Sequence, residues 1–153
     1  MSTRANIILK EGNEQLWFYR HSDGYPDGTL PTLNIFMDWL KTGKICNNLS
    51  QGAGWLIMLG AMEYNTLPSF KTEPDRDFGG RAMKGRTDIS SIESPKDWKV
   101  GAYEPTTGEH GDIEYLYEID MMAKTLKVFE VNRPNGWDKP SVHTLIEDKQ
   151  TIS

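Results

Sequence analysis

The chain has 153 residues, a formal net charge of −5 and one cysteine, Cys46. Because a chain of this length buries enough apolar surface for one hydrophobic core, we expect a single domain over residues 1–153. One cysteine excludes an intramolecular disulfide and a multi-cysteine zinc site, and we expect Cys46 to be a buried structural thiol. The acidic balance disfavours general binding to nucleic-acid phosphates.

The sequence carries no visible signal for export or membrane anchoring. Residues 1–6 lack the apolar stretch of a signal peptide, and the longest apolar run, residues 55–59, is far too short to span a bilayer. A single cysteine also suits a reducing compartment. We therefore expect the protein to act in the cytoplasm and not at a membrane.

A β-hairpin is predicted at the start of the chain. Residues 5–10 and 15–20 are short β-rich runs separated by a turn-forming Glu-Gly-Asn-Glu segment. In the second run, the period of two places Phe18 on one face and Tyr19 and His21 on the other. Both faces are partly apolar, so we expect this strand to lie centrally in the sheet.

A first helix is predicted after the loop that follows the hairpin. Thr29 or Thr32 can cap it, and Pro31 helps to start it. Apolar residues then follow the i, i+3, i+4, i+7 spacing as far as Leu40, and Gly43 ends the helix. This pattern is typical of an amphipathic helix that lies on a sheet.

A second helix is predicted from Asn47 or Asn48 to about Tyr64. It is apolar on nearly all sides, which indicates a buried helix. Gly52 and Gly54 each cost about 1 kcal/mol relative to alanine in a helix interior. The glycines therefore indicate either the close approach of another backbone or a break in the helix near these positions.

The second half of the chain predicts a long excursion and three further strands. Residues 67–95 are rich in Pro, Gly, Ser and charge, without a sustained period, which is typical of a surface excursion. Strands are expected at 98–104, 113–120 and 125–132. The tail, 133–153, is expected to form a loop or short helix and to end in disorder. We predict an α+β fold with a single, mainly antiparallel sheet of about five strands, in the order ββααβββ, and two helices on one face.

The loop of residues 21–28 is the first candidate site. It follows the aromatic strand and contains Asp-Gly and Pro-Asp-Gly, which are turn formers and favour a purely architectural double turn. A functional interpretation groups His21, Asp23 and Tyr25, because a carboxylate can orient an imidazole and an aromatic ring can form the floor of a pocket. The two interpretations are compatible.

A second candidate lies at the entry to the strand at 113–120. Glu109, His110, Asp112 and Glu114 could bind a divalent metal together with the histidine and aspartate of the first loop. The simpler interpretation is a polar turn that enters a solvated strand. No recognised metal motif occurs in the sequence, so we predict no metal cofactor.

The third candidate is a glycine-rich basic stretch inside the excursion. Arg81, Lys84 and Arg86 could bind an anion, because the neighbouring glycines allow the backbone to adopt the conformations that such a site needs. A solvated loop is the favoured interpretation. Neither a phosphate-binding P-loop nor a dinucleotide fingerprint is present, so a mononucleotide fold is not indicated.

The aromatic strand Leu-Trp-Phe-Tyr (16–19) is followed by His-x-Asp-Gly-Tyr-Pro (21–26), and further characteristic segments lie at 2–10, 50–55, 98–105 and 111–115. Together these segments resemble a family of small uncharacterised phage and prophage proteins. The resemblance covers most of the chain except the excursion and the tail. It implies a viral or mobile-element product made inside a bacterial cell, and it transfers no catalytic residues.

The leading hypothesis is a non-catalytic phage or prophage binding protein that engages a host protein or a small phosphorylated ligand. An enzyme is the less favoured alternative: a small metal-assisted hydrolase or nuclease that uses a His/Asp/Glu cluster. A virion or assembly subunit is the second alternative, and homo-oligomers remain open. The expected ligand-binding residues are His21, Asp23, Tyr25, Arg81, Lys84, Arg86 and His110.

Overall fold

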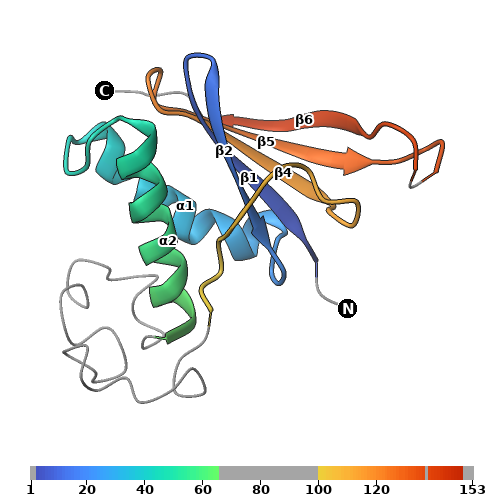
Figure 1. Ribbon diagram of the computed structural model, residues 1–153, viewed down its shortest axis with the longest axis horizontal. Coiled ribbons are helices and arrows are strands. Elements are labelled where there is room, and N and C mark those ends of the chain that lie inside the picture. Colours follow the sequence, from blue (N-terminus) through green and yellow to red (C-terminus); the bar gives the residue numbers. More distant parts are fainter. Residues whose placement is uncertain (1–2, 66–99, 137, 150–153) are drawn as a thin grey trace.

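The computed structural model describes residues 3–65, 100–136 and 138–149 (Figure 1). The elements, in chain order, are β1 (Ala5–Glu11), β2 (Glu14–Arg20), α1 (Pro26–Lys41), α2 (Leu49–Asn65), β3 (Glu104–Thr106), β4 (Tyr115–Asp120), β5 (Thr125–Asn132) and β6 (Val142–Lys149).

The six strands form one mixed sheet in the order β3-β2-β1-β4-β5-β6. β1 pairs in parallel with β4, and every other neighbouring pair is antiparallel. Figure 1 shows β1 and β2 crossing β5 and β6 at a wide angle, as the cumulative right-handed twist of a sheet requires. The two central strands, β1 and β4, are the most buried.

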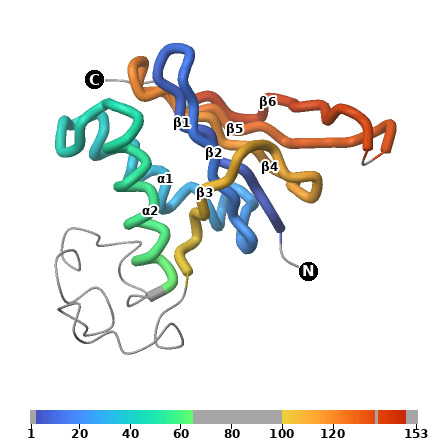
Figure 2. The backbone as a smooth tube through the Cα atoms, viewed as in Figure 1, coloured from blue at the N-terminus to red at the C-terminus, as the bar shows by residue number. Residues whose placement is uncertain are grey.

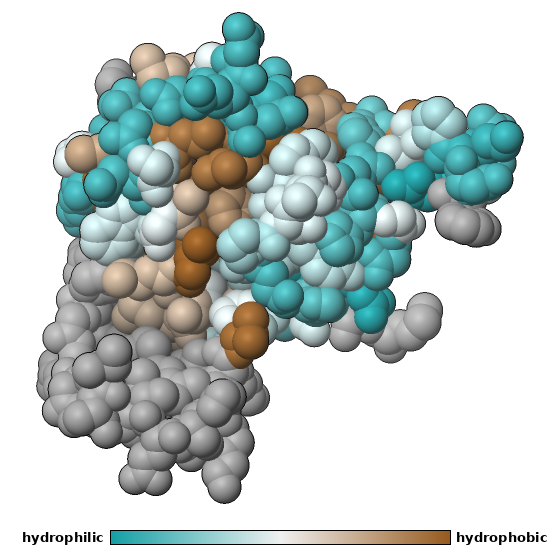
Figure 3. Space-filling view, in the orientation of Figure 1, coloured by the Kyte–Doolittle hydropathy of each residue, from teal (hydrophilic) through white to brown (hydrophobic). Residues whose placement is uncertain are grey.

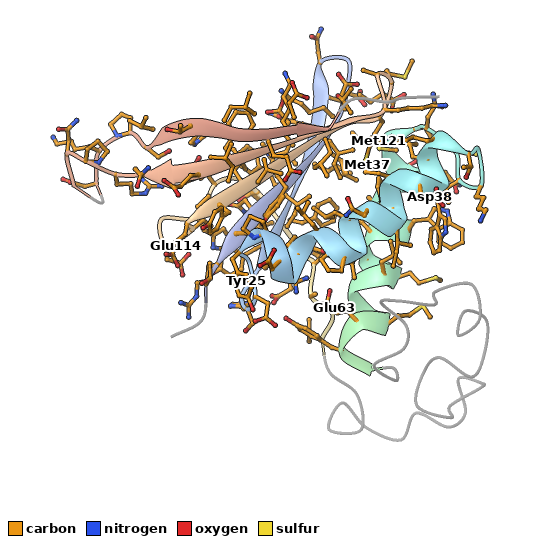
Figure 4. The ribbon with its side chains drawn as sticks, turned by 180° about the vertical axis from the view of Figure 1, so that it is seen from behind. Tyr25, Met37, Asp38, Glu63, Glu114 and Met121 are labelled. Carbon is orange, nitrogen blue, oxygen red and sulfur yellow. The ribbon has the colours of Figure 1, made fainter. Side chains whose placement is uncertain are left out.

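Both helices cover the same face of the sheet, and the main core lies between them and the strands. In β1, every second side chain, including Ile7 and Leu9, points into this core. Figure 3 shows apolar residues gathered along the junction of the helices and the sheet. Figure 4 shows Met37 of α1 and Met121, which follows β4, both of which belong to this core.

The opposite, outer face of the sheet has a second, smaller apolar cluster. The connection from β3 to β4 crosses this face over the hairpin strands (Figure 2). It is attached to β1 and to the residue before it by two hydrogen bonds: His110 N–H donates to Asn6 Oδ1 (2.8 Å), and Glu114 N–H donates to the Arg4 carbonyl (2.9 Å). The cluster consists of Ile8, Tyr19, Ile113, Leu116 and Val131, with Trp17 and Phe129 packed against it.

The α+β class and the placement of both helices on one face agree with the sequence prediction, but the strand number and order do not. The described residues contain six strands, because residues 142–149 of the tail pair with β5 instead of forming a loop or short helix. The strand expected at 98–104 is only Glu104–Thr106 within the described residues. The parallel pairing of β1 with β4 was not anticipated, since it joins segments far apart in the chain.

The first helix begins earlier than predicted. Pro26 occupies its first turn and Asp27 supplies an acidic side chain there, so the Pro-Asp-Gly segment starts the helix instead of forming a turn. Thr29 and Thr32 are therefore not caps. Both are buried, and Thr29 Oγ1 donates to the Asp23 carbonyl at 2.8 Å.

The second helix is continuous, and its predicted start is close. Asn48 Oδ1 accepts a hydrogen bond from the Gln51 N–H (2.9 Å), as an N-cap does. The close backbone is not at the two glycines named from the sequence: Gly52 faces the Met121 side chain, and a Cβ on Gly54 would meet nothing within 4 Å. It lies at Gly60, where a Cβ would be 2.8 Å from the Tyr103 nitrogen. The helix is not buried on all sides: Ile57 and Met58 are exposed.

Cys46 is an exposed free cysteine rather than a buried thiol, because it lies in the connection between the helices. No helix among the described residues has the length and apolar character needed to cross a membrane. The predicted excursion, 67–95, lies outside the described residues.

Candidate functional site

The end of β2 directs two consecutive side chains to opposite faces of the sheet. Arg20 points to the helix side, where its side chain is fully buried against that of Glu63, which is 2% exposed. The guanidinium Nη1 donates to Glu63 Oε1 at 2.9 Å, and Nη2 donates to the second carboxylate oxygen. The ring of Tyr103 lies 5.3 Å from the guanidinium carbon, which adds a cation–π contact.

The same guanidinium holds the loop of residues 21–28. Its Nε donates to the Ser22 carbonyl (2.8 Å) and its Nη2 to the Gly28 carbonyl (3.2 Å). Gly24 adds two contacts: its N–H donates to the Thr3 carbonyl (2.9 Å), and its carbonyl accepts from the Tyr117 hydroxyl (2.6 Å). The loop is therefore a fixed turn rather than a mobile flap.

Burial sets the protonation states on this side of the sheet. Burial alone would lower the pKa of Arg20, but the hydrogen bonds and charge of Glu63 outweigh it and the pKa is raised. Burial raises the pKa of Tyr103 and of Tyr117 well above the ordinary tyrosine value. The Tyr103 hydroxyl is hydrogen-bonded to Thr32 Oγ1. These groups form a neutral or paired structural network, with no free acid or base in it.

On the outer face, two histidines converge on Tyr19. The His110 ring stacks on the Tyr19 ring with centroids 3.9 Å apart, and the His21 ring meets it edge-on at 4.5 Å. His21 Nε2 lies 2.9 Å from Glu104 Oε2, and His110 Nε2 lies 2.8 Å from Thr106 Oγ1. Both imidazoles thus have a fixed orientation.

Tyr19 itself is anchored by a carboxylate. Its hydroxyl donates to Asp112 Oδ2 (2.8 Å), which also pairs with Arg4 Nε at 3.1 Å. Burial, reinforced by Asp112, raises the pKa of Tyr19 to about 12, so the phenol stays protonated at neutral pH. We call the following residues the Tyr19 cluster: Arg4, Tyr19, His21, Glu104, Thr106, His110 and Asp112.

An open cavity of about 430 Å³ adjoins the Tyr19 cluster. It shares Asp112 with the cluster and is also lined by Glu114 and Glu130, with Arg133 as its basic residue. Figure 4 shows Glu114 at the rim of the sheet, directed away from the helices. Three carboxylates against one guanidinium make this surface acidic.

Glu109 belongs to a different cluster. Its Oε2 accepts from Arg133 Nη2 (2.7 Å) and Ser141 Oγ (2.6 Å), and its Oε1 lies 2.7 Å from His143 Nε2. Ser141 Oγ is 3.0 Å from the same nitrogen of His143. A serine hydrolase needs the acid and the serine on opposite imidazole nitrogens. Here both contact Nε2. The group is therefore a set of ion pairs and hydrogen bonds that attaches the β3–β4 connection to the start of β6.

The predicted site residues are partly brought together. His21 and His110 meet through Tyr19, whereas no hydrogen bond within the described residues joins Asp23 to either histidine. Asp23 adopts a positive φ of 55°, and its Oδ1 is 3.4 Å from the Tyr25 hydroxyl. The described residues contain no group of three or more potential metal ligands. Three predicted site residues lie outside the described residues: Arg81, Lys84 and Arg86.

Two functional residues, the buried arginine and the third histidine, were not predicted from the sequence. Arg20 continues the alternation of Leu16 and Phe18, so it is a charged residue at a core-facing position, which signals a buried ion pair. The carboxylate partner, Glu63, carries no signal of its own. His143 lies in a segment predicted to lack a strand, and its alignment with Glu109 depends on the pairing of β6.

Comparison with known proteins adds no identification. No protein-family model matches the chain, and neither the curated proteins nor the solved structures include a significant match.

Proposed function

We propose that the protein is a non-catalytic binding protein that engages another protein through the Tyr19 cluster and the adjoining cavity. The observation that carries the proposal is the convergence of His21 and His110 on Tyr19, in a half-exposed array whose polar atoms are already oriented. A preoriented surface loses less side-chain entropy on binding. The partly exposed Arg4 adds a residue type that is enriched in protein interfaces. In the phage or prophage setting, the partner is a host protein.

The charges of this surface favour a protein over a small phosphorylated ligand. Arg4 is paired with Asp112, and the adjoining cavity carries the carboxylates of Glu114 and Glu130. Phosphate would be repelled there, whereas lysine or arginine side chains of a protein partner would be attracted. The expected partner therefore presents a basic patch.

The state of the central hydroxyl also favours binding over catalysis at the Tyr19 cluster. The Tyr19 hydroxyl donates to a carboxylate and has a pKa of about 12. A metal-assisted reaction would need at least three convergent ligands, and the described part of the chain supplies no such group.

Quantitative capture from bacterial lysate tests the proposal. The immobilised full chain is compared with His21→Ala and Asp112→Asn, and with Glu14→Gln, an exposed acid at the β1–β2 turn, as the matched control. We expect a protein retained by the original chain and the control but reduced at least about tenfold by both cluster variants, about 1.4 kcal/mol of binding free energy. Equal retention by all four chains would contradict the proposal.

A thermal-shift series with nucleotides and inorganic phosphate distinguishes the ligand classes. We expect no rise in melting temperature, because the surface is acidic. A rise that His21→Ala abolishes and Glu14→Gln preserves would favour a phosphorylated ligand instead.

A further inference from the structure

Asn6 is a fully buried polar residue on the outer face of β1. It alternates with Ile7, which points into the main core, and shares its face with Ile8 of the small apolar cluster. In the register of the sheet it lies beside Tyr19 of β2 and Leu116 of β4. A buried amide among apolar groups destabilises a fold unless its polar atoms are hydrogen-bonded, so the contacts of Asn6 must account for its presence here.

Both polar atoms of the Asn6 amide have a partner, and together they join three segments. Nδ2 donates to the Phe18 carbonyl of β2 (2.9 Å), and Oδ1 accepts from the His110 N–H (2.8 Å). The reverse placement of oxygen and nitrogen would set acceptor against acceptor and donor against donor, so only this orientation satisfies both contacts. Asn6 therefore attaches the β3–β4 connection to the hairpin at His110, the residue whose ring stacks on Tyr19.

A second contact of the connection is less shielded from water. The Asp112 side chain, which accepts from the Tyr19 hydroxyl and pairs with Arg4, is 53% exposed. Water screens an exposed ion pair, whereas a buried group that loses its hydrogen-bond partner is left with the full cost of its desolvation. The Asn6 contact should therefore restrict the position of the His110 backbone more than the Asp112 contact does.

We propose that Asn6 is the positioning residue of the Tyr19 cluster: it holds the His110 backbone so that the imidazole stacks on Tyr19. Asn6 is fully buried, so it acts on partner binding only through His110 and not by touching the partner. The effect on recognition rests on the proposed function, whereas the effect on the position of His110 does not. Separate measurements test these two steps.

Two substitutions at position 6 separate positioning from stability. Asn6→Leu has the same branched shape but leaves the Phe18 carbonyl and the His110 N–H without this partner. Asn6→Asp keeps the acceptor for His110, and its protonated form, which burial favours, also keeps a donor for Phe18. Leu40→Ala, in the main core on the helix side, is the matched control for lost stability. We expect all three variants to melt below the original chain, but only Asn6→Leu to release His110.

The imidazole proton resonances of His110 report its stacking, because an aromatic ring shifts the signals of protons that lie over its face. We expect Asn6→Leu to move the His110 signals toward those of Tyr19→Leu, which lacks the ring. Asn6→Asp and Leu40→Ala should leave the signals near their original positions. His110 signals that stay in place in a folded Asn6→Leu chain would overturn the proposal.

Hydrogen exchange of the original chain gives a test that needs no variant. The His110 N–H donates to a buried acceptor, so its protection factor should exceed that of the neighbouring, exposed Gly111 at least about tenfold. In Asn6→Leu this protection should be lost, while the Glu114 N–H, which donates to the Arg4 carbonyl, keeps its own. A His110 N–H as unprotected as that of Gly111 in the original chain would contradict the assigned role.

Capture of the partner from lysate tests the recognition step. We expect Asn6→Leu to retain at least about tenfold less partner than the original chain, and Asn6→Asp and Leu40→Ala to retain it. An Asn6→Leu chain with displaced His110 signals and full capture would overturn this step. If no chain retains a protein, the proposed function fails, and the His110 signals still decide whether Asn6 positions the imidazole.

Discussion

Arg20 and Tyr19 are neighbours in β2, yet they organise networks of opposite character. Arg20 faces the helices and is buried with Glu63, whereas Tyr19 faces the other side and gathers half-exposed charged groups. A buried charge depends on its partner because no water replaces it, while exposed pairs contribute only about 0–1 kcal/mol. Stability should therefore depend on the helix-side network, and recognition on the outer one.

Removal of the buried Glu63 carboxylate should cause the largest loss of stability. Glu63→Ala leaves the Arg20 guanidinium buried with only carbonyl and aromatic partners. We expect a loss of about 3–5 kcal/mol in the free energy of unfolding, measured by urea denaturation. The loop of residues 21–28 should also lose protection from hydrogen exchange, because the same guanidinium holds it.

Glu63→Gln is the control for this variant. It keeps the shape and one hydrogen-bond acceptor, so its loss should be clearly smaller than that of the alanine variant. If Glu63→Ala lowers the free energy of unfolding by less than about 1 kcal/mol, the buried Arg20–Glu63 pair does not stabilise the fold as proposed.

Removal of a single hydroxyl beneath the loop of residues 21–28 should have an intermediate effect on the free energy of unfolding. Tyr117→Phe removes the donor to the Gly24 carbonyl and leaves that buried oxygen without this partner. The expected cost is about 1–3 kcal/mol. Tyr115→Phe, two residues earlier on the same strand and only half-buried, should change stability by no more than about 0.5 kcal/mol. Equal melting curves for the two variants would contradict the prediction.

Alkaline pH should weaken the fold from both faces. Burial raises the pKa of Tyr19 from 10.0 to about 12, and it raises the pKa of Tyr103 and Tyr117 in the same direction. As pH rises from 10.0 to about 12, the unfolded chain releases the Tyr19 proton while the folded chain keeps it. The free energy of unfolding therefore falls across this window, and the stability that the protonated Tyr19 contributes is lost. Tyr19→Phe should make the fall in urea stability across this window shallower. An unchanged slope would show that Tyr19 does not titrate with this shift.

The local elements of the fold could be predicted because their signals are local. Two β-rich runs and the turn between them marked the hairpin, residues 125–132 carried a strand pattern that became β5, and Asn48 marked the start of α2. The parallel pairing of β1 with β4 has no such signal, because it depends on packing between segments separated by both helices. β6 was not predicted because most of its side chains are exposed, so it has no clear apolar alternation. Its assignment depends on pairing with β5, which lies beyond a turn.

The candidate site could be predicted only as a set of residue types. The sequence indicated His21 and His110, but their meeting on Tyr19 requires the β3–β4 connection to cross the outer face. The expected grouping of His21 with Asp23 is not seen, because Asp23 turns the backbone with a positive φ while its neighbour Gly24 packs against the start of β1. Turn geometry therefore separated residues that are adjacent in sequence.

A charge removed from the Tyr19 cluster should have the smallest effect on stability and a large effect on binding. Glu104→Gln removes the charge opposite His21 in a pair whose side chains are 36% and 55% exposed. Water screens such a pair, so the free energy of unfolding should change by less than about 1 kcal/mol. Partner capture should nevertheless fall, because the imidazole loses the group that orients it beside Tyr19. A variant that unfolds more easily by several kcal/mol and still captures its partner would reverse the roles assigned to the two networks.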